Sequence, residues 1–521
     1  MRVTRHRAVR SVCATLAALV LVPTAWASPS EFKLPPGPTG NLFDEPRQLY
    51  AATARGDFNG DGRADPVFMV VPEDGGDACV YVADPDGSGA LSAPALVLCE
   101  DSDGEIIRAA VLAVVPDADQ DGYDDLVIAH DWQAGATVVF GSPDGLSTSG
   151  RIDGLAIGVP YTSLDEVVSG DVNGDGWPDV VGARRDSTTS AGTLIAWYGA
   201  AEGYVFPDWI YEGPEEAYTG ASLVVPGDIN GDGMDDLLLS DMWGPEGGDP
   251  AALTLFFGAP AGLGASPDQV IGPDPRLTLV LVEEVIGDIN GDGHPDAMAE
   301  TLPLSGDIEL WLFLGSATGL DETFHELIPL EADAHFAALV KGPADFDGDG
   351  FADLALNWGQ GEWDTEDARR GLDIFYGSAA GPGAEADVRL VSTNGRSYVS
   401  SGLAGDLDAD GWDDLVLMFG DLDADTDEED YGSYTLVFGT NDLDADGTMR
   451  TQDCDDLDPA LSPEAADTTL DGIDQDCDGV DGSDTTQDRE PACGCQDGAK
   501  GAVFLLALAG VGLRRNRREL S

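Results

Sequence analysis

Seven short acidic loops carry the residues of this chain that are best suited to chemistry. Each loop reads Asp-x-Asn/Asp-x-Asp-Gly-x-x-Asp, and an apolar stretch follows it directly. Successive copies start 54 to 61 residues apart. Oxygen-bearing side chains at alternating positions are the ligands that Ca²⁺ prefers, so the loops predict calcium sites. The copies begin at Asp57, Asp117, Asp171, Asp228, Asp288, Asp345 and Asp406.

The spacing within a loop has a physical reason. Oxygens at positions 1, 3 and 5 point inward from a tightly turning backbone, and glycine at position 6 permits the bend. Position 7 offers its carbonyl, and Asp at position 9 completes the ligand set. In chain order the predicted ligands are Asp57, Asn59, Asp61, Arg63, Asp65, Asp117, Asp119, Asp121, Tyr123, Asp125, Asp171, Asn173, Asp175, Trp177, Asp179, Asp228, Asn230, Asp232, Met234, Asp236, Asp288, Asn290, Asp292, His294, Asp296, Asp345, Asp347, Asp349, Phe351, Asp353, Asp406, Asp408, Asp410, Trp412 and Asp414.

Two other interpretations of these loops are disfavoured. An EF-hand ends in a bidentate Glu at position 12 and joins two helices. Here position 12 is apolar and lies in a predicted strand. Solvated acidic turns would need no such spacing, and they would not repeat it seven times.

Apolar runs enter and leave each loop with little room between them, which predicts a β-hairpin closed by the loop. In the fourth copy a third strand is expected over residues 252–257 and a fourth near residues 269–271. Four strands per repeat form the unit of a β-propeller blade. The third strands end in recurring pairs, which we interpret as packing between repeats: Phe140-Gly141, Tyr198-Gly199, Phe257-Gly258, Tyr376-Gly377 and Phe438-Gly439, with Leu314-Gly315 as a variant.

The run Gly-Asp-Ile-Asn-Gly-Asp-Gly, with its apolar strand and Phe-Gly ending, resembles the FG-GAP repeat of integrin α-subunit propellers. The resemblance covers about residues 42–439. It implies an all-β, seven-bladed β-propeller with calcium in hairpin loops on one face, and we expect this domain over residues 28–440. No fourth strand is left for the last blade after Gly439, so we predict that the stretch near Asn41 and Phe43 supplies it.

Residues 441–483 form a second acidic segment, which resembles the MopE-type metal-binding motif of exported bacterial proteins. It offers few apolar residues for a core, so we expect calcium and a bridge between Cys454 and Cys477 to hold it together. A disordered acidic spacer is the alternative. The candidate ligands are Asp442, Asp444, Asp446, Asp453, Asp474, Asp476 and Asp478.

Both ends of the chain have the form of targeting segments. Residues 1–27 combine a basic start, a short apolar run and small residues before Ser28, as in a secretory signal peptide. A retained anchor is disfavoured because the apolar run is too short to span a bilayer. After a polar linker at residues 484–497, residues 498–521 resemble the myxobacterial C-terminal sorting signal, with Cys493 and Cys495 before an apolar run and an Arg cluster. We therefore expect an exported protein, either at the cell surface (outer membrane) or extracellular.

The cysteine count agrees with this destination. Six cysteines remain once the signal is removed, and an even number suits an oxidising compartment. Cys79 and Cys99 lie in neighbouring strand-like runs, and we expect a bridge across one blade.

The formal net charge of −73 disfavours nucleic acid and anionic membranes as partners, because both are negatively charged. Disorder is the simplest explanation of so acidic a chain. The hydrophobic fraction of 43%, arranged in short regular runs, argues against it for all but the last segment.

No catalytic motif stands out. The chain has no Gly-x-Ser-x-Gly, no His-Glu-x-x-His and no phosphate-binding glycine loop, so we do not expect an enzyme. Our first hypothesis is a monomeric, calcium-binding surface propeller that binds a protein or glycan in an adhesion-like role. It would contact a membrane only through C-terminal sorting or a lipid. The alternatives are a propeller-based polysaccharide lyase or hydrolase, and a purely structural calcium-dependent surface component.

Overall fold

A computed structural model gives the structure of the protein. It describes residues 32–33, 39–41, 48–71, 79–85, 91–92, 94–99, 112–129, 136–153, 164–185, 191–201, 203–204, 207–214, 219–241, 252–272, 277–303, 309–321, 324–327, 334–339, 343–360, 369–383, 386–391, 397–407, 411–420, 433–437, 439, 460–461, 465 and 475. The chain divides into two compact units, Met1–Gly439 and Thr440–Ser521. The first unit contains every strand, and the described residues include no helix.

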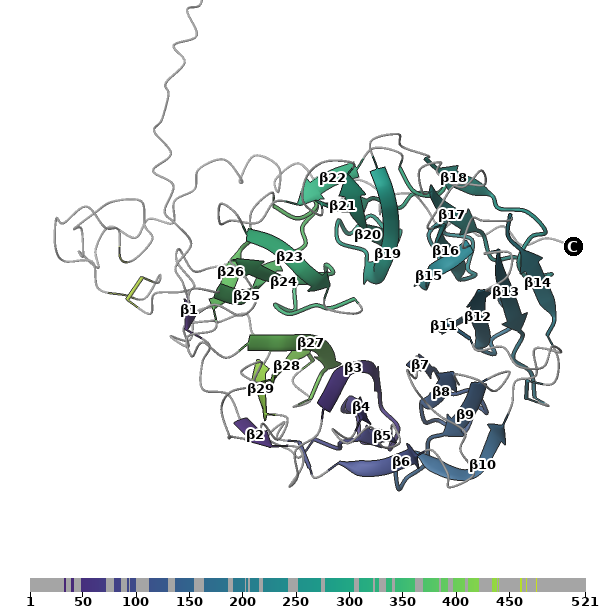
Figure 1. The fold of residues 1–521 in the computed structure, drawn as a ribbon, viewed down its shortest axis with the longest axis horizontal. Coiled ribbons are helices and arrows are strands. Elements are labelled where there is room, and N and C mark those ends of the chain that lie inside the picture. Colours follow the sequence, from purple (N-terminus) through teal and green to yellow (C-terminus); the bar gives the residue numbers. More distant parts are fainter. Residues whose placement is uncertain are drawn as a thin grey trace, which may run out of the picture. The chain divides into compact units, whose positions relative to one another are not determined.

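Among the described residues the strands form seven sheets arranged in a ring, which is the architecture of a β-propeller (Figure 1). Sheet 1 contains β3 (Gln48–Gly56), β4 (Asp65–Val71), β5 (Cys79–Val82) and β6 (Ala95–Cys99). Sheet 2 contains β7 (Leu112–Val115), β8 (Asp125–Ala129), β9 (Ala136–Phe140) and β10 (Ser147–Asp153). Sheet 3 contains β11 (Glu166–Gly170), β12 (Asp179–Arg185), β13 (Gly192–Trp197) and β14 (Trp209–Glu212). Sheets 4 and 5 contain β15 (Thr219–Gly227), β16 (Asp236–Asp241), β17 (Ala252–Phe256) and β18 (Gln269–Ile271); and β19 (Leu277–Gly287), β20 (Asp296–Pro303), β21 (Glu309–Phe313) and β22 (Phe324–Leu327).

Two N-terminal strands join the last two sheets. Sheet 6 contains β23 (Ala334–Leu339), β24 (Leu354–Gln360), β25 (Arg369–Phe375) and β26 (Val388–Val391), with β1 (Phe32–Lys33) parallel to β26 as a fifth strand. Sheet 7 contains β27 (Ser397–Gly405), β28 (Asp414–Gly420), β29 (Ser433–Val437) and β2 (Thr39–Asn41). β2 is antiparallel to β29 and pairs Gly40 with Tyr434. This pairing confirms that the N-terminal stretch supplies the fourth strand of the last sheet, whereas β1 was not predicted.

Burial follows from the stacking of the sheets. β8 (sequence DLVIA) and β13 (GTLIAW) are buried at every position, because each has a neighbouring sheet on both faces. β14 (WIYE) lies at the outer edge, where partly buried and exposed residues alternate. The first strand of each sheet faces the centre of the ring (Figure 1).

The hydrophobic core lies between the sheets. One cluster joins Phe58 of sheet 1 to Leu126 of sheet 2, and another joins Val172 of sheet 3 to Leu237 of sheet 4. Side chains that end the third strands pack against such clusters, as predicted, and they are Phe140, Tyr198, Phe257 and Leu314. Among the residues described, none forms a helix with the length and hydropathy of a membrane span.

Candidate metal-binding loops

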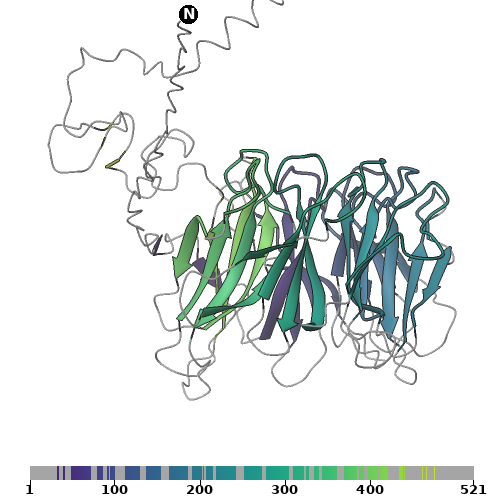
Figure 2. The same cartoon turned by 90° about the horizontal axis from the view of Figure 1, so that it is seen from above.

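All seven acidic loops connect the first and second strands of their sheets, as the hairpin prediction required. For example, residues 228–235 join β15 to β16, which pair in antiparallel fashion. Because strand direction alternates along each sheet, these loops and the loops between third and fourth strands emerge on one face of the ring. Figure 2 shows the strands from the side, with the loops gathered at their ends.

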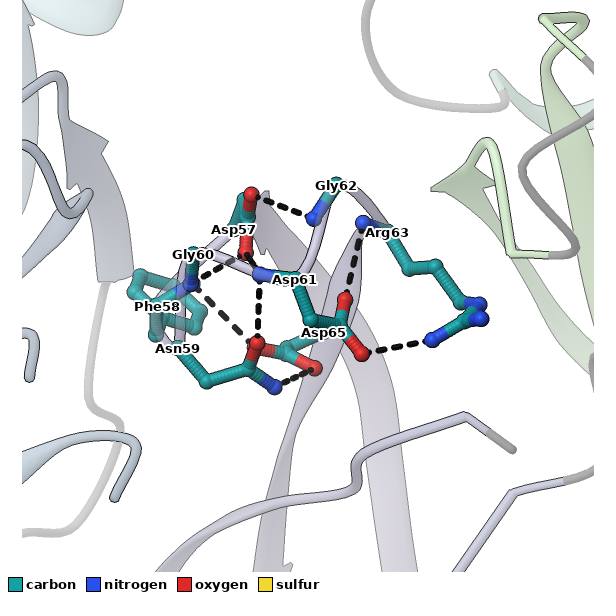
Figure 3. Close-up of polar contacts among 8 residues, drawn as sticks. All are labelled: Asp57, Phe58, Asn59, Gly60, Asp61, Gly62, Arg63 and Asp65. Carbon is teal, nitrogen blue, oxygen red and sulfur yellow. Dashed lines mark hydrogen bonds and ion pairs between the residues drawn. The ribbon is translucent and has the colours of Figure 1, made fainter. Parts of the chain in front are cut away.

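In the first loop, side-chain oxygens turn inward and accept backbone hydrogen bonds (Figure 3). Asp57 Oδ1 accepts from Gly60 N at 2.6 Å and from Asp61 N at 3.0 Å. Asn59 Oδ1 accepts from Asp61 N at 2.9 Å. Asp61 Oδ1 accepts from Arg63 N at 3.0 Å. The oxygens of positions 1, 3 and 5 are therefore oriented by the loop's own amides.

The contact between positions 1 and 6 is present in every copy. The amide of each position-6 glycine donates to the position-1 carboxylate of its own loop, and these glycines are Gly62, Gly122, Gly176, Gly233, Gly293, Gly350 and Gly411. All seven have φ between 86° and 98°, and a Cβ at any of them would have nothing within 4 Å. Glycine is thus required for its positive φ and not for space, as the sequence predicted.

The position-9 aspartate is buried and holds two parts of its sheet together. Its Oδ2 accepts from the position-2 amide, as in Ile229 N to Asp236 at 2.9 Å. Its Oδ1 accepts from the glycine that ends the third strand, as in Gly258 N to Asp236 at 2.9 Å. A Cβ at Gly258 would collide with Asp235 O, which explains the glycine of the recurring aromatic-Gly pair. The same two contacts occur at Asp125, Asp179, Asp296, Asp353 and Asp414.

The first sheet departs from this pattern. The strand register places Pro85 where the other sheets have the glycine that follows the third strand. Proline has no amide hydrogen, so Pro85 cannot donate to Asp65 as those glycines donate to their position-9 aspartates. Asp65 Oδ1 instead accepts from Asn59 Nδ2 at 3.3 Å. Asp65 Oδ2 keeps the usual contact, with Phe58 N at 3.1 Å.

Burial makes these carboxylates hard to ionise in the metal-free protein. Four position-9 carboxyl groups have a pKa raised to about 7, mainly because they are buried and also because other acids lie nearby. They are Asp125, Asp179, Asp236 and Asp296. The same causes raise the pKa of Asp65 and Asp353 to about 8. A bound cation would favour the ionised form of each group.

Within the part of the chain that the structure describes, two loops bring three carboxylates together tightly enough to share one cation. Oxygens of Asp117, Asp119 and Asp121 lie within 4.8 Å of one another. The same holds for oxygens of Asp345, Asp347 and Asp353, where Asp347 and Asp353 are buried. Since every side-chain donor in these sets is an oxygen, they fit a hard cation.

The side chains at positions 7 and 8 contact the preceding loop, a role that sequence reasoning missed. A Cβ at Gly291 would collide with the ring of Phe351, because position 7 of one loop covers position 4 of the loop before it. His294 Nδ1 lies 2.7 Å from Ile229 O across another boundary. The only sequence signal was the bulk of most position-7 residues. That the backbone carbonyl of position 7 binds the metal stays a prediction.

Some predicted ligands lie outside the described residues. They are Asp408 and Asp410 in the seventh loop, and Asp442, Asp444, Asp446, Asp453, Asp474, Asp476 and Asp478 in the C-terminal segment. The pairing of Cys454 with Cys477 falls in the same category. In sheet 1, Cys79 and Cys99 are direct partners across β5 and β6.

Comparison with known families assigns two segments of the chain. Residues 171–239 match the FG-GAP-like repeat, and this span includes the third and fourth loops. Residues 453–482 match the MopE family, described as a "Putative metal-binding motif". No curated protein matches the sequence.

Several solved structures resemble the chain distantly. A rhamnogalacturonan lyase, YesW, has a TM-score of 0.36 and 14% identity, over 79% of this chain and 76% of that one. The Dos1 propeller has a TM-score of 0.39 and 10% identity, over 77% of this chain and 95% of that one. A β-fructofuranosidase from Schwanniomyces occidentalis has a TM-score of 0.32 and 10% identity, over 75% and 88%.

Proposed function

We propose that this protein is a calcium-binding, seven-bladed β-propeller that binds a protein or glycan outside the cell. The observation that carries the proposal is the repetition of one loop geometry. In all seven loops the position-6 amide orients the position-1 carboxylate. A turn that needed only solvation would not require the same inward orientation in each copy.

Calcium fits the donor set better than other common metals. Carboxylate and amide oxygens in a flexible loop suit Ca²⁺, whereas Mg²⁺ demands a near-ideal octahedron and usually keeps several waters. The MopE family is named for copper binding. Residues 453–482 contain no His and no Met, so they lack the side chains that copper prefers besides Cys. We therefore extend the calcium proposal to this segment.

Calcium uptake by the full chain tests the proposal directly. We expect calorimetric titration to count seven or more ions, and we expect melting temperature to rise strongly when calcium replaces chelator. Magnesium at the same concentration is the control and should stabilise less. Few ions and no shift would mean that the loops are solvated turns.

The binding role rests on the propeller form and on the absence of a catalytic motif in the sequence. Many of the loops on the face opposite the calcium loops lie outside the described residues, so the contact residues are not assigned. A glycan array and a pull-down, each in calcium and in chelator, test the role. Turnover of uronate or sulfated glycans would support the lyase or hydrolase alternative instead. Self-assembly without any ligand would favour a structural component.

Export to an oxidising compartment is part of the same proposal. Direct cross-strand partners such as Cys79 and Cys99 lie at a separation that a disulfide can span. We expect both thiols to resist maleimide labelling until the protein is reduced. Immediate labelling of the native protein would contradict the bridge.

A further inference from the structure

Position 8 of the loops, which offers no ligand in the predicted set, is an aspartate in three of the seven copies. These residues are Asp124, Asp235 and Asp413. Each reaches across a sheet boundary and accepts a hydrogen bond from the position-1 amide of the preceding loop. The bonds are Asp57 N to Asp124 Oδ2 at 2.9 Å, Asp171 N to Asp235 Oδ2 at 2.8 Å, and Asp345 N to Asp413 Oδ2 at 3.0 Å.

A second bond runs in the opposite direction at each of these boundaries. The position-8 amide donates to the position-1 carbonyl of the preceding loop: Asp124 N to Asp57 O at 3.2 Å, Asp235 N to Asp171 O at 3.0 Å, and Asp413 N to Asp345 O at 3.1 Å. One residue of the next sheet therefore holds both the N–H and the C=O of the residue that supplies the first ligand. We call this pair of bonds the clamp.

The loops that begin at Asp117, Asp228, Asp288 and Asp406 lack the carboxylate half of the clamp, because the loop that follows each of them has no Asp at position 8. At position 8 these following loops have Pro178, Pro295, Ala352 and Ala64, in that order. The two alanines keep the backbone bond, with Ala64 N to Asp406 O and Ala352 N to Asp288 O both at 3.1 Å. The two prolines have no amide hydrogen to donate. The chain thus contains its own comparison between clamped and unclamped loops.

The packing leaves space for the clamp. Gly56 and Gly170 precede position 1 in two of the clamped loops. A Cβ at Gly56 would lie 3.1 Å from Asp124 Cβ, and one at Gly170 would lie 2.8 Å from Asp235 Oδ2. Side chains there would crowd the clamping carboxylates.

We propose that Asp124, Asp235 and Asp413 are positioning residues that raise the calcium affinity of the preceding loop, and not of their own. This inference rests on the calcium proposal above. Groups that orient a ligand without touching the metal commonly change affinity by roughly 10- to 100-fold. The clamp also places a carboxylate close to a cation site, which favours binding electrostatically. It links occupancy of the loops at 57–65, 171–179 and 345–353 to the sheet that follows each of them.

Asp235→Ala tests the proposal, since alanine already occupies position 8 at Ala64 and Ala352. By calorimetry on the full chain with Ca²⁺, we expect one site to weaken roughly 10- to 100-fold. A purely structural role would lower the melting temperature equally in calcium and in chelator, leaving the site affinities unchanged. That outcome would overturn the inference.

A double-mutant cycle identifies which loop is affected. Asp175→Ala disables the loop at 171–179, and Asp232→Ala disables the loop at 228–236. Adding Asp235→Ala to the first background should cost no further site, whereas adding it to the second should weaken one more. The reverse pattern would assign Asp235 to its own loop and refute the proposal.

A variant that adds a clamp gives a test that does not require the protein to fold after losing a contact. Ala352→Asp places a carboxylate beside Gly287, where a Cβ would otherwise meet the Ala352 side chain. We expect the loop at 288–296 to bind Ca²⁺ several-fold more tightly, and unchanged affinity in a folded variant would count against the proposal. If the unmodified chain takes up no Ca²⁺, the proposed function itself fails. Calcium uptake that is indifferent to both variants overturns the clamp alone.

Discussion

The position-5 and position-9 aspartates of one loop share a residue type but differ in environment. Asp236 is fully buried and accepts from Ile229 N of its own loop and from Gly258 N just after the third strand, whereas Asp232 is exposed and accepts from Met234 N in its own turn. Asp236 therefore stabilises the fold even without metal, whereas Asp232 gains its main role when a cation is present. Sequence reasoning gave them the same role because the motif does not encode burial.

Asp236→Ala should therefore destabilise the protein with or without calcium. It leaves the buried Gly258 N without its acceptor, at a cost of about 1–3 kcal/mol, and leaves Ile229 N with only Gly227 O, at 3.1 Å. The matched variant Asp232→Ala should change the melting temperature little in chelator and lower it in calcium. Thermal melts of both variants in the two conditions check this, and equal losses in chelator would contradict the distinction.

The raised pKa values give the metal-free protein an unusual pH dependence. Asp296 has a pKa of about 7 in the folded state against about 4 in an unfolded chain. Between these values the folded state binds more protons, so stability is greatest at the acidic end and falls as pH rises towards 7. Groups such as Asp353 extend the fall to about pH 8.

We expect metal-free melting temperatures to fall from pH 5 to pH 8. Calcium binds the ionised carboxylates, so the stabilisation that it provides should grow over the same range. A series of melts at four pH values, with calcium and with chelator, checks both slopes. A metal-free melting temperature that rises with pH would show that the buried carboxyls ionise freely.

At the scale of the element, each sheet is a hairpin fastened to a third strand. The hairpins and the position-6 glycines could be predicted because they lie within one repeat and recur, whereas the metal ligands stay a prediction. The hydrogen bonds between the loops of neighbouring repeats could not be predicted. The clamp at Asp235 depends on the angle at which one sheet meets the next, and position 8 alternates among Ala, Asp and Pro with no period in the sequence. The strand β1, the fifth strand of sheet 6, could not be predicted either, because two residues are too few to show the alternation of a strand.

Gly258→Ala tests the fastening of the third strand. The added Cβ would collide with Asp235 O, so the backbone must shift at a cost of about 1–3 kcal/mol. Gly264→Ala in the following loop is the control, since the nearest atom to its added Cβ would be the carbonyl oxygen of the exposed residue Ser266, at 3.1 Å. Chemical denaturation compares the two, and an equal effect would argue against a close approach at Gly258.

At the scale of the whole molecule, the ring closes by two devices. Ala64 N donates to Asp406 O, so the boundary between the last and first sheets has the same bond as internal boundaries. β2 then adds the N-terminal stretch to a sheet whose other strands end near Val437. Strands from both ends of the propeller unit thus lie in one sheet.

Deleting residues 28–41 should lower the melting temperature, because it exposes the edge of β29 and releases this closure. Deleting residues 28–36 removes β1 alone and is the matched control, with a smaller expected effect. Calorimetric melting compares the deletions with the full chain. Equal melting temperatures for all three would show that β2 contributes nothing to closure.

Pro178 lies at the boundary between sheets 2 and 3, and Pro295 lies at the boundary between sheets 4 and 5. These two boundaries divide the ring into one arc of sheets 3 and 4 and another of sheets 5, 6, 7, 1 and 2. Inside each arc, successive loops are joined by a backbone N–H···O bond. At the two proline boundaries side chains take its place, with Gln120 Nε2 bonding Gly176 O at 3.1 Å and His294 beside Ile229 O. Under tension we expect the ring to open first at these two boundaries. Sheets 3 and 4, which contain the FG-GAP-like match at residues 171–239, would then separate as one mechanical unit.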